Sequence, residues 1–242
     1  MMKRQIPNLI TLCNLICGVI AILYAIKGQV ATAAVFILLG IFFDFFDGLT
    51  ARLLHVASPL GKELDSLADV VTSGVAPCFI LYTILGELTP EGFLPWVSLL
   101  MPAFSAYRLG KFNLDERQHQ SFLGLPAPAN ALIWVGLGLA YCEVTDTECF
   151  GKVTAPILAV LSLITDVLLI SEIPMFSLKF NFKEMEWKNN RVRYIFLIGC
   201  IAILVGGILL LPGKAFFISA SVIIVWYILL SIATQRKEVV HG

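Results

Sequence analysis

Four aspartates stand at helical spacing within sequence that is otherwise apolar enough to cross a membrane. Asp44 and Asp47 are three residues apart, and Asp65 and Asp69 are four apart, so each pair shares one face of a helix. A carboxylate at mid-bilayer costs about 2.5 to 3.5 kcal/mol, so four facing lipid would cost roughly 10 to 14 kcal/mol. Bundle-interior packing, a bound cation or a water-filled cavity must offset that cost, and each describes a functional site better than a structural one.

The side-chain types indicate the chemistry of such a site. A helical hairpin would bring the four carboxylates together. Hard oxygen ligands from two helices, with no nearby His or Cys cluster, suit Mg²⁺ or Mn²⁺ rather than zinc. Carboxylates that hold a divalent metal are typical of phosphate chemistry.

The composition places these acids in a polytopic membrane protein. The 242 residues are 58% hydrophobic and 14% charged, with 17 basic and 17 acidic side chains, and the mean hydropathy is +0.87. The balanced charge and the lack of any Lys/Arg-rich run argue against a nucleic-acid binder. The six cysteines form no CxxC pair, which argues against a zinc site or a disulfide framework.

Eight apolar runs are long enough to cross a hydrocarbon core of about 30 Å. We therefore expect an all-α polytopic transmembrane helical bundle of about eight helices, forming a single integral membrane catalytic domain over residues 1–242. The first run lacks a small-residue cleavage site, so we expect it to be retained as a span. The expected spans are 7–26, 30–54, 63–86, 93–113, 126–142, 153–172, 193–211 and 214–234.

The basic residues predict the orientation of the bundle. With both termini in the cytoplasm, only Lys27, Lys152 and Lys214 of the 17 Lys and Arg residues lie on the outer side, as the positive-inside rule requires. This orientation puts the aspartates at the cytoplasmic ends of the second and third helices. We expect a protein of the bacterial cytoplasmic (inner) membrane whose active site faces the cytoplasm.

The aspartates belong to a longer pattern that has eight fixed residues over 26 positions. The pattern resembles the signature of the CDP-alcohol phosphotransferase family at every specified position. Members transfer a phosphatidyl or similar group from a CDP-linked donor to an alcohol and release CMP, within a membrane helical bundle that is typically a homodimer. The pattern reads Asp44-x2-Asp47-Gly48-x2-Ala51-Arg52-x8-Gly61-x3-Asp65-x3-Asp69.

This resemblance implies roles for the fixed residues. Asp44, Asp47 and Asp65 would hold two Mg²⁺ or Mn²⁺ ions, and Asp69, also near the metal, would be the general base. Two ions could neutralise the diphosphate while a carboxylate removes the proton of the acceptor hydroxyl. The expected CDP-binding residues include two from a polar stripe on the first helix and are Asn8, Thr11, Asp44, Asp47, Gly48, Ala51, Arg52, Gly61 and Asp65.

Several of these residues have a structural alternative when each is considered alone. Small residues such as Gly48 and Ala51 commonly pack helices together. An arginine such as Arg52 commonly reaches toward the membrane interface. Asn8 and Thr11 could form hydrogen bonds between helices instead of contacting the nucleotide.

Segments outside the signature suggest the acceptor alcohol. Residues 6–18, 107–113, 122–131 and 171–180 resemble the phosphatidylserine synthases of the family. A zwitterion such as L-serine needs a cation for its carboxylate, and a guanidinium can bind a carboxylate through two hydrogen bonds. The expected serine-binding residues are Arg108, Lys111 and Asn113, with interfacial placement as the alternative for the two cations. Glu172 is a speculative partner for the serine ammonium, and the intramembrane acid Asp166 is assigned no role.

The resemblance thus implies transfer of the phosphatidyl group of CDP-diacylglycerol to the hydroxyl of L-serine, giving phosphatidylserine and CMP, by a homodimer among membrane lipids. One alternative keeps the chemistry and changes the acceptor to glycerol 3-phosphate or an inositol phosphate. Another is a divalent-cation transporter, because intramembrane acids also line ion pathways. A transporter would distribute its acids through the membrane depth, whereas these acids cluster at one side.

Overall fold

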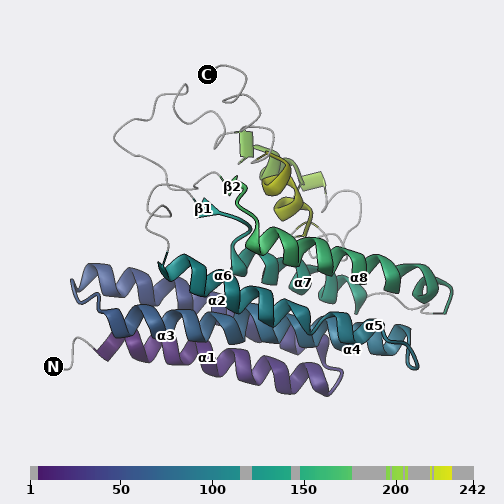
Figure 1. The fold of residues 1–242 in the computed structure, drawn as a ribbon, viewed down its shortest axis with the longest axis horizontal. Helices are drawn as coiled ribbons and strands as arrows, with labels where there is room; N and C mark the ends of the chain where they lie inside the picture. The colour runs from purple at the N-terminus through teal and green to yellow at the C-terminus, as the bar shows by residue number, and fades with distance from the viewer. Residues whose placement is uncertain are drawn as a thin grey trace.

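The computed structural model describes residues 5–114, 122–142 and 148–175 and parts of the segment 195–230. These residues form a bundle of helices (Figure 1), which confirms the expected all-α class. The elements are α1 (Gln5–Ile26), α2 (Val30–Leu53), α3 (Pro59–Asp69), the π-helix η2 (Val70–Val75), α4 (Ala76–Leu88), α5 (Leu94–Val97), α6 (Leu100–Leu114), β1 (Phe122–Leu123), α7 (Ala127–Tyr141), α8 (Glu148–Ile170) and β2 (Pro174–Met175).

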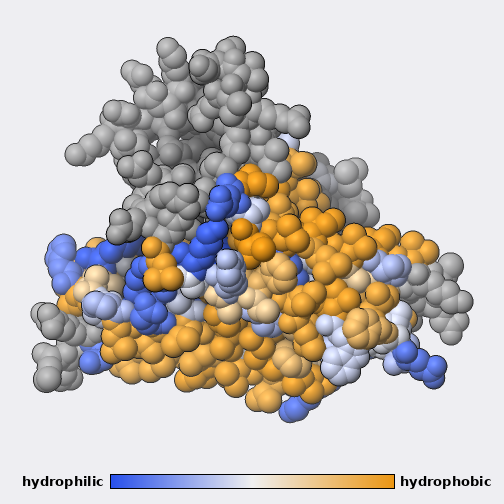
Figure 2. Space-filling view, in the orientation of Figure 1, coloured by the Kyte–Doolittle hydropathy of each residue, from blue (hydrophilic) through white to orange (hydrophobic). Residues whose placement is uncertain are grey.

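Four helical stretches in the described part of the chain are long and apolar enough to cross a membrane. Figure 2 shows hydrophobic side chains over most of the visible face of the helices, with hydrophilic ones gathered at the left end and along the upper left edge and a smaller group at the right end. The four stretches are Gln5–Ile26, Val30–Leu53, Pro59–Leu88 and Val153–Ile170, and shorter apolar helices cover Ala127–Tyr141 and Ser221–Leu230. Nine of the 19 residues in the span expected at 193–211 lie outside the described residues.

The span expected at 93–113 consists of two helices, α5 and α6, separated by a turn at residues 98–99. The hydroxyl of Ser98 donates to the carbonyl of Pro95 at 2.7 Å, and the backbone N–H of Met101 donates to the carbonyl of Ser98. In a continuous helix that carbonyl would accept from residue 102, but Pro102 has no N–H to donate. The helix therefore begins again at Leu100.

The third stretch is continuous but changes its winding. Ser58 caps α3, since its extended backbone lets Oγ accept from the N–H of Gly61 at 3.1 Å, and Pro59 occupies the first helical position. The chain passes into η2 directly after Asp69 and returns to α-helix at Ala76. A π-helix is rare and frequently accompanies a functional site.

The core lies between α1, α2, α4 and α7, and small residues let the first two helices approach closely. Its largest fully buried side chain is that of Trp134 on α7. The outward faces of α1 and α2 carry exposed Leu, Ile and Phe side chains, as expected for surfaces that meet lipid tails. The fully buried alanines of α1 and α2 are Ala21, Ala25, Ala33 and Ala34.

A short antiparallel pairing fastens the connection between α6 and α7 to the end of α8. Phe122 pairs with Met175 and Leu123 with Pro174. The next residue, Gly124, has φ +75° and would place an added Cβ 2.7 Å from the carbonyl oxygens of two residues at the end of α8. The segments 122–124 and 171–175, which are far apart in sequence, therefore meet in the fold.

Candidate active site

Three of the four aspartates converge at one end of the α2–α3 hairpin. Asp44 and Asp47 come from the last turns of α2, and Asp65 comes from the middle of α3. One carboxylate oxygen from each lies within 4.8 Å of the other two. The hairpin thus achieves the convergence that the helical spacing predicts for these three residues.

The donor set fits a divalent cation. Asp47 is only 5% exposed, and the Oδ1 atom of Asp65 is buried with no hydrogen-bond partner in the part of the chain that the structure describes. Three carboxylates this close repel one another unless a cation lies among them. Their oxygens are the ligands that Mg²⁺ and Mn²⁺ prefer.

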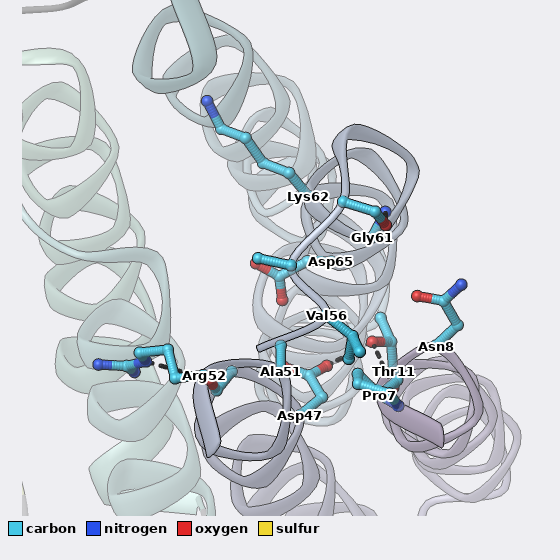
Figure 3. A pocket seen from close by; sticks show the side chains of 13 residues that line it. Pro7, Asn8, Thr11, Asp47, Ala51, Arg52, Val56, Gly61, Lys62 and Asp65 are labelled. Carbon is cyan, nitrogen blue, oxygen red and sulfur yellow. Dashed lines mark hydrogen bonds between the residues drawn. The ribbon is translucent and has the colours of Figure 1, made fainter. Parts of the chain in front are cut away.

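A cavity of about 240 Å³ opens beside these carboxylates. Figure 3 shows the side chains of Thr11 and Asp47 pointing toward each other, with the carboxylate of Asp65 close by. All predicted CDP-binding residues except Asp44 line the cavity, and Asp44 belongs to the carboxylate cluster. The lining residues are Pro7, Asn8, Thr11, Asp47, Gly48, Ala51, Arg52, Val56, Ala57, Ser58, Gly61, Lys62 and Asp65.

Asn8 and Thr11, the two residues of the first helix predicted to bind CDP, both line the cavity but differ in their surroundings. Thr11 is buried, and its hydroxyl donates to Oδ2 of Asp47, so α1 fixes the position of one candidate metal ligand. The side-chain amide of Asn8 donates to Oε1 of Gln5 at 3.3 Å, on the exposed side of the same helix. The interhelical alternative is therefore observed for Thr11, while the amide of Asn8 is placed where a ligand could reach it.

Arg52 lies at the rim of the cavity. Its Nε donates to the backbone carbonyl of Gly48 at 3.0 Å, and the side chain is exposed. In Figure 3 its guanidinium extends away from Asp47. The remaining guanidinium donors are available to a group that enters from outside.

The two glycines of the cavity wall differ in the space around them. A Cβ added to Gly48 would meet only the Arg52 guanidinium, at 3.6 Å. A Cβ added to Gly61 would lie 3.2 Å from both Asn8 Oδ1 and Ser58 Oγ. A side chain at Gly61 would thus crowd Asn8 and Ser58, whereas one at Gly48 would make only an ordinary contact with Arg52.

Asp69 lies one turn beyond Asp65 and is not among the three converging oxygens. It is 8% exposed, and its Oδ1 accepts from the amide of Asn14 on α1 at 3.3 Å. The predicted site residues do not include Asn14, although it continues the helical stripe of Asn8 and Thr11. The charges of Asp69 and Asp65 interact, so Asp69 borders the cluster.

Arg108 approaches the same region from α6. Its side chain is 7% exposed, and its Nε has no hydrogen-bond partner among the described residues. Its guanidinium carbon lies 5.9 Å from the ring centre of Phe112. The charge of Arg108 interacts favourably with that of Asp69. A buried guanidinium beside a carboxylate suits an anionic group that binds next to a base.

Lys111 and Asn113 contact other parts of the protein. The ammonium of Lys111 lies 2.9 Å from Oε1 of Glu172. The side-chain amide of Asn113 donates to Ser66 Oγ at 2.9 Å. The backbone carbonyl of Asn113 accepts from the ammonium of Lys62 at 3.2 Å. The end of α6 is therefore held to α3 on one side and to the segment after α8 on the other, and serine binding by Lys111 and Asn113 stays a prediction.

Asp166 lies apart from the cavity. It is fully buried on α8, and neither carboxylate oxygen has a hydrogen-bond partner in the described structure. The structure shows no ion pair between Asp166 and any described Lys or Arg.

Some cavity residues were not predicted from the sequence. Ser58 and Lys62 line the cavity along with Pro7, Val56 and Ala57. The pair Ser58–Pro59 is a helix-start signal that could have placed the first residue of α3. Lys62 follows Gly61 on the first turn of that helix, so it could have been expected near the cavity once the helix start was set.

The chain is similar to known proteins over most of its length. A family model for CDP-alcohol phosphatidyltransferase matches residues 4–165. The CDP-diacylglycerol–serine O-phosphatidyltransferase of Bacillus subtilis (strain 168) is 40% identical over 139 residues, which are 57% of this chain and 77% of that protein. The protein of the same name from Mycobacterium leprae (strain TN) is 30% identical over 98% of this chain and 75% of its own length. That of Methanocaldococcus jannaschii is 32% identical over 82% of this chain and 83% of its own length.

Proposed function

This chain belongs to the CDP-alcohol phosphatidyltransferase family, and on that premise we propose that it transfers the phosphatidyl group of CDP-diacylglycerol to L-serine. The products are phosphatidylserine and CMP. Relatives named for this reaction, at 30% to 40% identity, support the choice of acceptor. The observation that carries the proposal is the cluster of Asp44, Asp47 and Asp65. It borders a cavity that Gly48, Ala51, Arg52 and Gly61 of the signature also line.

The carboxylate cluster would receive the diphosphate of the donor. Asp44, Asp47 and Asp65 would hold Mg²⁺ or Mn²⁺, which when bound neutralises phosphate charge. Two ions would suit the two phosphates of the donor. Asn8, Gly48, Ala51, Arg52 and Gly61 would surround the cytidine, ribose and phosphates.

Asp69 would act on the acceptor. One of its carboxylate oxygens takes the proton of the serine hydroxyl as the serine oxygen forms a bond to the phosphorus that bears diacylglycerol. The bond between that phosphorus and the oxygen of CMP breaks, and CMP leaves with the bonding electrons. A base within hydrogen-bond reach of the reacting hydroxyl typically contributes about 10²- to 10⁴-fold in rate.

Arg108 would bind the serine carboxylate. Its guanidinium is buried and its charge already interacts with that of Asp69, so serine bound there would have its hydroxyl near the base. A single guanidinium suits one carboxylate, whereas a phosphorylated acceptor favours several cations. The charge of Lys111 is compensated by Glu172, which favours serine over glycerol 3-phosphate or an inositol phosphate.

We place the active site on the cytoplasmic side of a bacterial inner membrane. The distribution of basic residues supports the cytoplasmic side. The serine and CMP of the reaction are water-soluble, and the tails of the donor and product would stay in the bilayer. The family resemblance supports a homodimer.

The decisive experiment is CMP release by the purified protein in vesicles that contain CDP-diacylglycerol. We expect release that requires both L-serine and Mg²⁺ or Mn²⁺, with labelled serine appearing in lipid. Glycerol 3-phosphate and inositol phosphate are tested in parallel, and incorporation of either without serine incorporation would overturn the choice of acceptor. Metal flux into the vesicles without CMP release would favour a transporter instead. Asp47→Asn serves as the inactive control.

A further inference from the structure

Asn14 stands at the centre of a buried contact between α1 and the end of α3. Its side chain is completely buried, and its Nδ2 donates to Asp69 Oδ1 at 3.3 Å. One turn earlier on the same helix, the hydroxyl of Thr11 donates to Asp47. A single face of α1 therefore supplies one donor to a carboxylate of α2 and another to a carboxylate of α3.

Thr72 fixes the backbone that carries Asn14. Its hydroxyl donates to the carbonyl oxygen of Asn14 at 3.0 Å. Its side chain fills a notch formed by two glycines, because a Cβ on Gly18 would lie 2.5 Å from Thr72 Oγ1 and one on Gly40 would lie 2.5 Å from Thr72 Cγ2. The Gly40 Cβ would also lie 2.9 Å from Asn14 Oδ1, so the same notch limits how the amide can turn.

The backbone changes its winding at this contact. Asp69 is the last residue of α3, and Thr72 lies within η2, which packs against α1. A π-helix inserts an extra residue into a turn and so alters which side chains face a neighbouring helix. Asn14, Asp69 and Thr72 therefore all lie at this one irregular contact between helices.

We propose that Asn14 is a positioning residue that holds the carboxylate of Asp69 in the orientation needed to accept the acceptor proton. The inference rests on the proposed role of Asp69 as the base. The amide donates to Oδ1 and thereby restricts rotation of the carboxylate. Asn14 itself touches neither substrate nor the reacting atoms.

The kinetic consequence follows from geometry. A base must lie within about 2.6 to 3.2 Å of the hydroxyl oxygen that it deprotonates, and a displacement of 1 Å can cost about 10²-fold in rate. Loss of the amide should therefore lower kcat, because the base is less often in place. It should leave the KM for CDP-diacylglycerol unchanged, because the nucleotide cavity does not include Asn14.

The test compares kcat and both KM values for Asn14→Ala with those of the wild type. We expect kcat to fall by about 10- to 100-fold, with the KM for CDP-diacylglycerol within twofold. A raised KM for CDP-diacylglycerol with unchanged kcat would overturn the proposal. Because wild-type activity is measured in the same assay, absence of serine-dependent CMP release by the wild type would instead refute the proposed function.

A double-mutant cycle separates positioning from a general structural effect. In Asp69→Glu the carboxylate is displaced from the Asn14 amide, so adding Asn14→Ala should reduce kcat much less than it does in the wild type. An equal reduction in both backgrounds would show that Asn14 does not act through Asp69 and would overturn the inference.

Two threonine variants complete the experiment. Thr83→Val is the matched control, since its hydroxyl donates to the carbonyl of Ala25 at 2.9 Å and joins α4 to α1 away from the cavity. It should keep wild-type kcat. Thr72→Val keeps the side-chain shape and loosens the backbone of Asn14, so kcat should fall by about 3- to 10-fold with the KM for CDP-diacylglycerol unchanged. If Asn14→Ala does not fold, Thr72→Val decides, and wild-type kcat in that variant would overturn the proposal.

Discussion

The ammonium of Lys111 lies 2.9 Å from Oε1 of Glu172, so two groups that a serine zwitterion could use are bound to each other. The pair joins α6 to the segment that follows α8, two parts of the chain that are 61 residues apart. Arg108 lies one turn before Lys111 on α6. Its side chain is buried, whereas that of Lys111 is partly exposed. The ion pair therefore fixes the end of the helix that carries the proposed carboxylate-binding residue.

Charge reversal tests whether Lys111 acts through this pair. Lys111→Glu should raise the KM for serine by placing two acids together, and the swap Lys111→Glu with Glu172→Lys should restore it to within about threefold. An exposed pair contributes only about 0 to 1 kcal/mol, so the melting temperature should change little. Serine KM and thermal unfolding are the measurements. If the swap leaves the KM as high as the single variant does, Lys111 contacts serine directly.

Arg108→Lys should weaken serine binding selectively. Lysine keeps the charge but loses the planar pair of donors, and a hydrogen bond to a charged group contributes about 1.5 to 3 kcal/mol. We expect the KM for serine to rise by roughly 10- to 100-fold while the KM for CDP-diacylglycerol stays constant. Arg52→Lys, at the rim of the cavity, is the matched variant and should change the KM for the donor instead. A reversed pattern would contradict both assignments.

Asp69→Asn should abolish turnover without preventing donor binding. The amide keeps the shape of the side chain but cannot take a proton, so kcat should fall by about 10² or more. Binding of CDP-diacylglycerol, measured by the thermal shift it produces, should survive. Turnover near that of the wild type would show that another group removes the proton.

Metal binding can be measured without catalysis. A cation held by the folded protein stabilises it by about 2.7 kcal/mol when its concentration is 100 times its dissociation constant. Mn²⁺ should therefore raise the melting temperature of the wild type, and EDTA should reverse the rise. Asp65→Asn should remove the effect, since Asp65 supplies one of the three converging oxygens. An unchanged Mn²⁺ response in that variant would place the ion elsewhere.

Two glycine variants separate the space used by a ligand from the space used by packing. Gly48→Ala adds a methyl group that meets only Arg52 at 3.6 Å, so we expect normal stability and a raised KM for CDP-diacylglycerol. Gly18→Ala would place the methyl 2.5 Å from Thr72 Oγ1, and overpacking of this kind typically costs about 1 to 3 kcal/mol. Thermal unfolding and donor KM distinguish the two. Equal loss of stability in both variants would contradict the proposed difference.

The helical spacing placed Asp44 with Asp47 and Asp65 with Asp69, because side chains three or four residues apart share a helix face. The short connection between the two helices then allowed the convergence of Asp44, Asp47 and Asp65 to be predicted. The long apolar runs predicted α1, α2 and the Pro59–Leu88 stretch for a similar reason. These features depend on local sequence. The division between α5 and α6 is also local, and the absence of an N–H at Pro102 could have indicated it.

Contacts between distant residues could not be predicted in the same way. Nothing in the spacing of Asn14 and Asp69, which are 55 residues apart, indicates that the amide of one reaches the carboxylate of the other. The pairing of Lys111 with Glu172 depends likewise on how α6 and α8 pack. A polar stripe on α1 was visible in the sequence, but the partner of each side chain is set by the arrangement of the bundle.

The length of the Pro59–Leu88 stretch has a consequence for where the two substrates meet. Its 30 residues correspond to roughly 45 Å of helix, about 15 Å more than the hydrocarbon core of a bilayer. The polar α3 end, with Lys62 and Glu63 exposed, provides the excess. A span placed in this way would put the carboxylates near the boundary between hydrocarbon and water, where a dissolved amino acid could meet a lipid whose tails stay in the bilayer.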